Sequence, residues 1–279
     1  MTSLRRRIVD DLLAAYRAGR HLILLFDYDG TLVPIVEHPR LARLDRSGHR
    51  LLQRLAGQPR VHVGIISGRR LEELKEMLCL ANLCLAGTSG LEIELYGLRL
   101  AHPKTREARV FIREITHRLS VQLAAFPGAW LEHKGLGFTV HFRHALPHLI
   151  EGLRTQVRET IEPFSPGLRS TEGPMALEVT AELGWNKGTA VSMIVRHLKP
   201  CNYALLYAGD SANDAEGMET AIALGGTGIG VGPDAPAIAQ YCLPDTEALH
   251  ELLLDLEDSL RAVTKPTDRT LGCRQRGIA

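Results

Sequence analysis

The feature that most constrains the fold is an apolar run that ends abruptly in two carboxylates. Residues 22–26 are all apolar. A short apolar run closed by a turn signal is typical of a buried strand in a parallel sheet. In open α/β sheets, the functional residues lie just beyond the carboxyl ends of such strands. The run leads into the motif Asp27-Tyr28-Asp29-Gly30-Thr31.

The two carboxylates can share one site. Alternate residues of an extended segment lie on one face, so Asp27 and Asp29 can converge. They can bind a hard cation and still have separate roles, one as nucleophile and one in proton transfer. An EF-hand calcium loop is excluded, because Leu32 and His38 stand where Gly and Glu are needed. A strand ending in a solvated acidic turn is the remaining alternative.

Composition narrows the class of protein. The 279 residues allow one or two domains, and the net charge of +1 gives no indication of nucleic-acid or acidic-membrane binding. The longest apolar runs are far shorter than the ~20 residues of a membrane span. Residues 1–20 have the pattern of an amphipathic helix rather than a signal peptide. The five cysteines include no Cys-x-x-Cys pair, which favours a reducing cytoplasm. A monomer is favoured.

The order of elements predicts two units. Helix and strand patterns alternate in 1–102 and in 182–262, which predicts an α/β unit with a parallel sheet. Residues 103–181 instead show the order αββαββ, which predicts an inserted α+β unit. The tail at 263–279 is polar and aperiodic, and we expect it to be disordered.

The expected element bounds follow from these patterns. Helices are expected at 4–18, 47–55, 70–80, 104–124, 147–161, 186–197, 218–222 and 246–261. Strands are expected at 22–27, 61–66, 84–86, 130–134, 137–143, 168–171, 176–180, 202–208 and 229–231.

Two further segments suit an anionic ligand. Ser67-Gly68-Arg69 follows a strand pattern, and a hydroxyl with free backbone N–H groups at a helix start binds anions well. A plain helix N-cap by Ser67 is an equal alternative. Lys187 begins a predicted helix, where the helix dipole disfavours a cation unless an anion is nearby. A solvated surface lysine is the alternative there.

A second pair of carboxylates follows another buried strand. Asp210 and Asp214 come directly after the pattern at 202–208. They would complete an oxygen-rich octahedral site for Mg²⁺, and two helix-capping acids are the alternative. Four carboxylates at two strand ends are costly unless a cation neutralises them.

Together these motifs resemble those of the haloacid dehalogenase-like phosphatases. The resemblance covers about 1–102 and 182–260, and it implies a Rossmann-like parallel-sheet core with an inserted cap domain. It rests on four motifs in the family's order, namely Asp27-Tyr28-Asp29-Gly30-Thr31, Ser67-Gly68-Arg69, Lys187 and Gly209-Asp210-Ser211-Ala212-Asn213-Asp214.

The resemblance implies a role for each residue. Asp27 would attack phosphorus to form an aspartyl-phosphate, and Asp29 would protonate the leaving alcohol and then deprotonate water. Asn213 and Asp214 would order the outer shell of the Mg²⁺. The implied metal site comprises Asp27, Asp29 through its backbone carbonyl, Asp210 and Asp214, and the implied phosphate site comprises Thr31, Ser67, Gly68 and Lys187.

The inserted unit resembles the cap of trehalose-6-phosphate phosphatases, which closes over the sugar. The resemblance rests on 132–143, on 177–179 and on the approach to the core lysine at 184–188. Period-two alternation puts Phe138, Val140 and Phe142 inward and leaves a polar face outward. An ordinary solvated sheet face is the alternative. The expected sugar-binding residues are Arg69, Glu132, Lys134, His141, Arg143 and Glu178.

Two departures from the family pattern leave the sugar open. Ser89 stands where the family has His, and the fourth motif lacks the family's Asp-Asp-x-Thr-Asp-Glu form. Neither departure removes a catalytic group. We expect a Mg²⁺-dependent trehalose-6-phosphate phosphatase. The alternatives are a phosphatase for sucrose, glucosylglycerol or mannosylglycerate phosphate, and a non-catalytic sugar-phosphate sensor.

Overall fold

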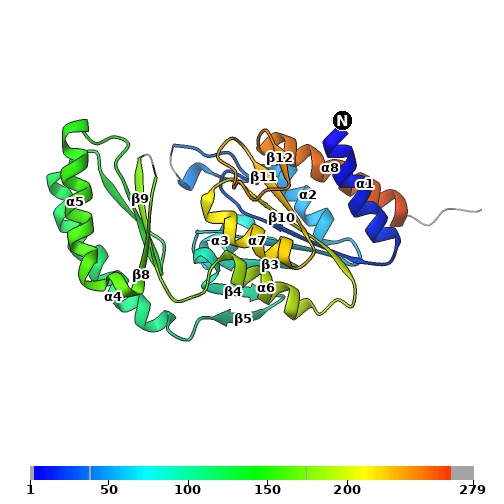
Figure 1. Ribbon diagram of the computed structural model, residues 1–279, viewed down its shortest axis with the longest axis horizontal. Helices are drawn as coiled ribbons and strands as arrows, with labels where there is room; N and C mark the ends of the chain where they lie inside the picture. The colour runs from blue at the N-terminus through cyan, green and yellow to red at the C-terminus, as the bar shows by residue number, and fades with distance from the viewer. Residues whose placement is uncertain (1–2, 38, 174, 265–279) are drawn as a thin grey trace, which may run out of the picture.

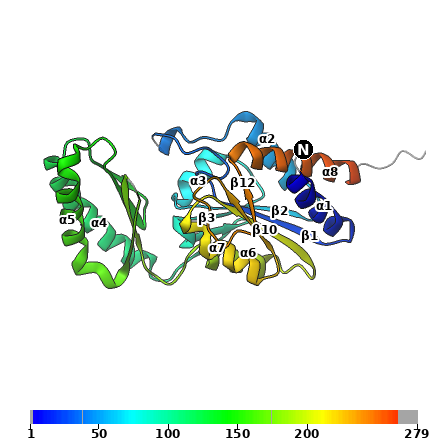
Figure 2. The ribbon, with the colours of Figure 1, turned by 45° about the horizontal axis from the view of Figure 1, so that its top comes forward.

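The protein contains two sheets with helices packed on them. The computed structural model describes residues 3–37, 39–173 and 175–264, and it has one eight-stranded and one four-stranded sheet. The two sheets lie at opposite ends of the long axis of the molecule (Figures 1 and 2). The α/β class expected from the sequence is therefore confirmed.

The large sheet, called the core sheet below, has the strand order β12-β11-β10-β1-β2-β3-β4-β5. The strands from β12 to β3 are parallel, whereas β4 and β5 add an antiparallel hairpin at one edge. The bounds are β1 (His21–Phe26), β2 (Val61–Ile66), β3 (Leu83–Gly87), β4 (Glu92–Leu95), β5 (Leu98–Ala101), β10 (Tyr203–Gly209), β11 (Thr227–Val231) and β12 (Tyr241–Leu243).

Strand β1 is buried on both faces. Leu22, Leu24 and Phe26 pack into one cluster, and Ile23 and Leu25 pack into another, because successive side chains point to opposite faces. Helices on both faces are the reason for the continuous apolar run. The first cluster includes α1 (Ser3–Arg17), α2 (Arg46–Ala56), α3 (Leu71–Leu78) and α8 (Thr246–Thr264), and the second includes α6 (Lys187–Leu198) and α7 (Ala215–Ala223).

The small sheet, called the cap sheet below, is antiparallel with the order β6-β7-β9-β8. Phe138, Val140 and Phe142 are buried against the helices on one face, as the alternation predicts. These helices lie on the side away from the core sheet (Figures 1 and 2). The elements are α4 (Thr105–Gln122), β6 (Trp130–His133), β7 (Gly137–His141), α5 (Ile150–Ile161), β8 (Leu168–Glu172) and β9 (Ala176–Ala181).

Some elements differ from the expected bounds. The short strands β4, β5 and β12 were not expected from the sequence. The helix expected at 147–161 begins with a 3₁₀ turn, and α8 continues to Thr264, so residues 263 and 264 of the expected tail are helical. Residues 265–279 lie outside the described residues. The 3₁₀ turns are η1 (Pro39–Leu41), η2 (Thr88–Gly90), η3 (Leu123–Ala125), η4 (Pro147–Leu149), η5 (Glu162–Gly167) and η6 (Ala212–Asp214).

The helices were compared with the requirements of a membrane span. In the part of the chain that the structure describes, none combines the necessary length with sufficient apolar character.

Truncation of Phe138 tests whether the cap sheet has a hydrophobic core of its own. Phe138→Ala should lower the free energy of unfolding by about 3–5 kcal/mol, because the buried ring leaves a cavity. Chemical denaturation followed by circular dichroism measures this loss. Val121→Ala, on the exposed side of α4, is the matched control and should change stability by less than about 0.5 kcal/mol. Equal effects of the two substitutions would contradict this packing.

Candidate active site

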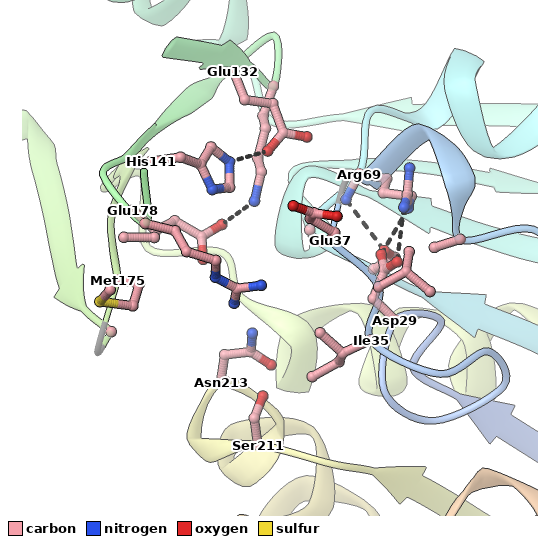
Figure 3. A pocket seen from close by; sticks show the side chains of 18 of the residues that line it. Asp29, Ile35, Glu37, Arg69, Glu132, His141, Met175, Glu178, Ser211 and Asn213 are labelled. Atoms are coloured by element: carbon pink, nitrogen blue, oxygen red, sulfur yellow. Dashed lines mark hydrogen bonds and ion pairs between the residues drawn. The ribbon is translucent and has the colours of Figure 1, made fainter. Parts of the chain in front are cut away.

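A cavity of about 400 Å³ lies between the core sheet and the open face of the cap sheet. Figure 3 shows the cap residues Glu132, His141 and Glu178 on one side and Asp29 and Arg69 on the other. The expected site residues that line the cavity are Asp27, Asp29, Ser67, Gly68, Arg69 and Asp210 from the core, and Glu132, Lys134, His141, Arg143 and Glu178 from the cap.

Strand order explains why distant motifs meet on the core side. Asp27 follows β1, Ser67 follows β2 and Asp210 follows β10. Strand β1 pairs in parallel with both β2 and β10, so the three residues leave the same sheet edge side by side. The backbone N–H of Asp27 still donates to the carbonyl of Ala208, at 2.9 Å. This hydrogen bond fixes the position of Asp27 along the direction of β10.

Gly30 lets the two acidic loops approach each other. Its φ of +82° is in the region that favours glycine, and a Cβ there would lie 2.1 Å from Oδ2 of Asp210. A larger residue would therefore displace this carboxylate. The glycine of the first motif has a steric role in placing the fourth motif.

Lys187 lies at the centre of the acidic site. Its Nζ donates to Oδ1 of Asp27 at 2.7 Å, to Oδ1 of Asp214 at 2.6 Å and to Oδ1 of Asn213 at 2.9 Å. Its exposure is 1%, so the alternative of a solvated surface lysine is excluded. A capping box between Asn186 and Thr189 starts α6 and directs Lys187 to this position.

Burial and neighbouring charges shift the pKa values of the lysine and two of the acids in this site. Burial opposes the ammonium of Lys187, but the carboxylates of Asp214 and Asp27 outweigh burial and raise its pKa. Burial raises the pKa of Asp27 well above its usual range, although Lys187 opposes the shift. Burial and then the charge of Asp214 raise the pKa of Asp210 to about 6. Burial is the largest cause of both carboxyl shifts, so a charged form of either acid is costly here without a further cation.

The acidic cluster fits a hard divalent cation. Asp27, Asp210 and Asp214 each place a carboxylate oxygen within 4.8 Å of the others. When all three acids are ionised, three carboxylates and one ammonium leave two negative charges, which one divalent cation would balance. An all-oxygen donor set suits Mg²⁺.

Asp214 organises the loop around the cluster. Its Oδ1 accepts from Lys187 and from the hydroxyl of Tyr207, the latter at 2.7 Å. Its Oδ2 accepts from the backbone N–H groups of Asp210 at 3.2 Å and Ser211 at 3.3 Å. Asp214 is also the N3 residue of a capping box whose N-cap is Ser211, at the start of η6, so the capping alternative holds in part for Asp214.

The carboxylate of Asp29 turns away from the acidic cluster. Its oxygens accept from Nε and Nη2 of Arg69, each at 2.7 Å. The hydroxyl of Ser67 accepts from the backbone N–H of Arg69 at 3.2 Å. Helix α3 has Arg70 at its N-cap position, so the interpretation of Ser67 as the helix cap is wrong.

Thr31 lies apart from the cavity. It is not among the residues that line it, and its buried hydroxyl has no hydrogen-bond partner among the described residues. The side chain instead faces a small hollow near Leu44 and Leu249.

The cap contributes a row of paired polar groups. Lys134 Nζ donates to Oε1 of Glu178 at 2.9 Å, and His141 Nε2 lies 2.8 Å from Oε2 of Glu132. Strand register places Glu132, Thr139 and Glu178 in one line across the sheet. Burial opposes the charge of Lys134, but Glu178 and Glu132 raise its pKa.

The cap pair reaches the loop after β2. A Cβ built on Gly68 would lie 3.5 Å from Oε1 of Glu178 and 4.0 Å from Nζ of Lys134. The core loop and the cap side chains therefore border the same small space. A ligand bound there would contact both units at once.

Several lining residues were not expected from the sequence. Trp130 stacks on His141 with ring centroids 4.0 Å apart, and period two from Glu132 could have identified it. Glu37 lies 3.4 Å from Nε2 of His144 and so connects the core loop to the cap. Loop residues have no periodic pattern that would reveal them. The others are Ile35, Val36, Ala42, Gly173, Met175, Ala176 and Ser211, whereas Asn213, which was expected beside the metal, also lines the cavity.

Comparison with known proteins identifies the family. The trehalose-phosphatase family model matches residues 25–228. The chain belongs to the trehalose-phosphatase family. It is 31% identical over 206 residues to a trehalose-phosphate phosphatase of Mycobacterium avium, covering 72% of this chain and 52% of the relative. It is 31% identical over 217 residues to the probable trehalose-phosphate phosphatase H of Arabidopsis thaliana, covering 72% and 61%.

A solved structure supports the fold of this family member. The C-terminal domain of a C. albicans trehalose-6-phosphate phosphatase superposes with a TM-score of 0.77 at 22% identity, over 90% of this chain and 97% of that one. The chain spans only 52–61% of the length of the first curated relatives it matches.

Removal of Lys187 tests the charge balance of the site. Lys187→Met leaves Asp27 and Asp214 buried without their cation, and it should lower the free energy of unfolding by about 3–5 kcal/mol. Chemical denaturation in metal-free buffer measures the loss. Lys75→Met removes a partly exposed pair with Glu94, and this control should have a much smaller effect. A stable Lys187→Met protein would contradict the central role of this contact.

Proposed function

We propose that this protein is a Mg²⁺-dependent phosphatase that hydrolyses trehalose 6-phosphate through an aspartyl-phosphate on Asp27. One observation carries the proposal. The carboxylate of Asp27 lies at the end of β1, hydrogen-bonded to buried Lys187, in a cavity whose opposite wall is the polar row of the cap. Family membership and the names of the relatives support the same activity.

Asp27 is the nucleophile in this proposal. Lys187 holds Oδ1, and Oδ2 would attack phosphorus. The new bond joins Oδ2 to phosphorus, and the bond from phosphorus to the sugar oxygen breaks. Asp29 gives a proton to the departing oxygen and later takes one from the water that attacks the aspartyl-phosphate.

The phosphoryl group would be held where the core loops meet. Ser67 and the backbone at Gly68 border the cavity and would bind the phosphoryl oxygens. Asp27 and Asp210, with the backbone carbonyl of Asp29, would hold Mg²⁺. When bound, this ion would reduce the repulsion between the attacking carboxylate and the phosphate.

The cap segment 103–181 would select the sugar. Its paired side chains Lys134–Glu178 and His141–Glu132 offer donors and acceptors in a row, which suits a ligand with many hydroxyl groups. Arg143 adds a further donor to the same wall. The flat ring of Trp130 provides an apolar surface beside this row.

Phosphate release from a panel of esters tests the substrate. The panel comprises the 6-phosphates of trehalose, sucrose and glucose, with glucosylglycerol phosphate and mannosylglycerate phosphate. With Mg²⁺ present, kcat/KM for trehalose 6-phosphate should exceed that for every other member by about tenfold or more, because a matched polar site disfavours unpaired groups. Asp27→Asn is the control and should abolish turnover without unfolding, since an amide is a poor nucleophile.

The outcomes separate the alternatives. A maximum for another member would keep the phosphatase and reject the trehalose assignment. Release from no member, with Mg²⁺ bound, would favour a sugar-phosphate sensor.

Substitution of Glu178 tests the role of the cap in selecting the sugar. Glu178→Ala should lower kcat/KM for trehalose 6-phosphate by about tenfold or more, since a charged hydrogen-bonding group is lost. Turnover of p-nitrophenyl phosphate should change by less than about threefold, because an aryl group does not need the polar row. Steady-state assays on both substrates measure the difference. Equal losses would contradict a sugar-binding role.

A further inference from the structure

We propose that Arg69 is a positioning residue for Asp29, whose carboxylate it holds in one orientation at the edge of the cavity. This inference rests on the proposed function. It concerns how the carboxylate assigned to proton transfer is kept in place. The contact between Arg69 and Asp29 lies at the edge of the cavity in Figure 3.

The contact is a bidentate ion pair. Nε of Arg69 donates to Oδ2 of Asp29 and Nη2 donates to Oδ1, each at 2.7 Å. Such a fork fixes the plane of the carboxylate as well as its distance. The side chain of Asp29 therefore cannot rotate while both contacts are present.

Arg69 is the anchored partner of the pair. Its Nη1 donates to Oε1 of Glu73 at 2.7 Å and lies 3.5 Å from Sδ of Met77, both on α3. Its guanidinium carbon is 5.4 Å from the centre of the Tyr28 ring. The exposure of the Arg69 side chain is 4%, against 38% for the side chain of Asp29. A change in the pair would therefore move Asp29 rather than Arg69.

The pair keeps the side chain of Asp29 apart from the other acids. Among the described residues, the cluster that could bind a cation contains Asp27, Asp210 and Asp214 but no oxygen of the Asp29 carboxylate. Asp29 nevertheless lines the cavity. In this orientation its oxygens border the space in which substrate and water would lie.

The same geometry serves both proton transfers. Each oxygen of Asp29 accepts one N–H from Arg69 and keeps a lone pair that can face the cavity. In the first step the bond from phosphorus to the sugar oxygen breaks, and that oxygen takes a proton from Asp29. In the second step water binds phosphorus, Asp27 departs, and Asp29 takes the proton of the water. Both steps need the carboxyl group of Asp29 in the same place, which the contact with Arg69 fixes.

Arg69→Lys tests this positioning role, because Lys keeps the charge and loses the bidentate contact. Both proton transfers should slow, so kcat and kcat/KM on the preferred ester of the panel should each fall about tenfold or more. KM should change by less than about threefold, because the proposal gives Arg69 no direct contact with the substrate. Arg118→Lys, which alters an exposed pair with Glu114, is the matched control and should behave like the parent.

A double-mutant cycle tests whether Arg69 acts through Asp29. On p-nitrophenyl phosphate, Arg69→Met should lower kcat in the parent but cause no further loss in an Asp29→Ala background. Equal losses in both backgrounds would overturn the inference. A raised KM with unchanged kcat in Arg69→Lys would also overturn it and assign Arg69 to substrate binding. Absence of parent turnover on every ester would instead overturn the proposed function together with this inference.

Discussion

The contact of buried Lys187 with Asp27 and Asp214 is the interaction on which the rest of the site depends. It joins the end of β1 to the start of α6 and the loop after β10, three segments far apart in the sequence. Burial makes an isolated carboxylate or ammonium costly, so each of these groups is stable only because the others are present. The same network places a carboxylate oxygen of Asp27 close to those of Asp210 and Asp214, where a cation could bind. The contacts that hold these three segments together are therefore also the contacts that surround the proposed nucleophile.

The cap sheet supplies a row of paired polar side chains, which the core sheet lacks. The core provides carboxylates, a lysine and a loop after β2, which suit a phosphoryl group and a cation. The cap sheet buries Phe138 and its neighbours against α4 and α5, and its other face is free to present paired polar side chains. Lys134 and Glu178 lie beside the core loop at Gly68, where a Cβ would be 4.0 Å and 3.5 Å from their polar atoms. The site is therefore shared between two sheets that are each stabilised by their own apolar cluster.

Much of the fold could be predicted from the sequence because it follows from periodicity. The run at 22–26 and the alternation at 138–142 each match the observed burial. The hairpin of β4 and β5 was missed because short strands at a sheet edge have a weak pattern. The convergence of the acids could be predicted from strand order, whereas the pairing of Asp29 with Arg69 could not, since it depends on side-chain conformation. The site roles and the sugar remain predictions.

Rapid-quench peptide mapping is the most direct test of the central claim that Asp27 is the nucleophile. The enzyme is mixed with trehalose 6-phosphate and Mg²⁺, quenched in acid within one turnover, digested and analysed by mass spectrometry. The account predicts one phosphoryl group on the peptide that contains Asp27, appearing before free phosphate and disappearing as phosphate is released. Phosphate release with no phosphorylated peptide at any time, or with the group on another residue, would contradict it.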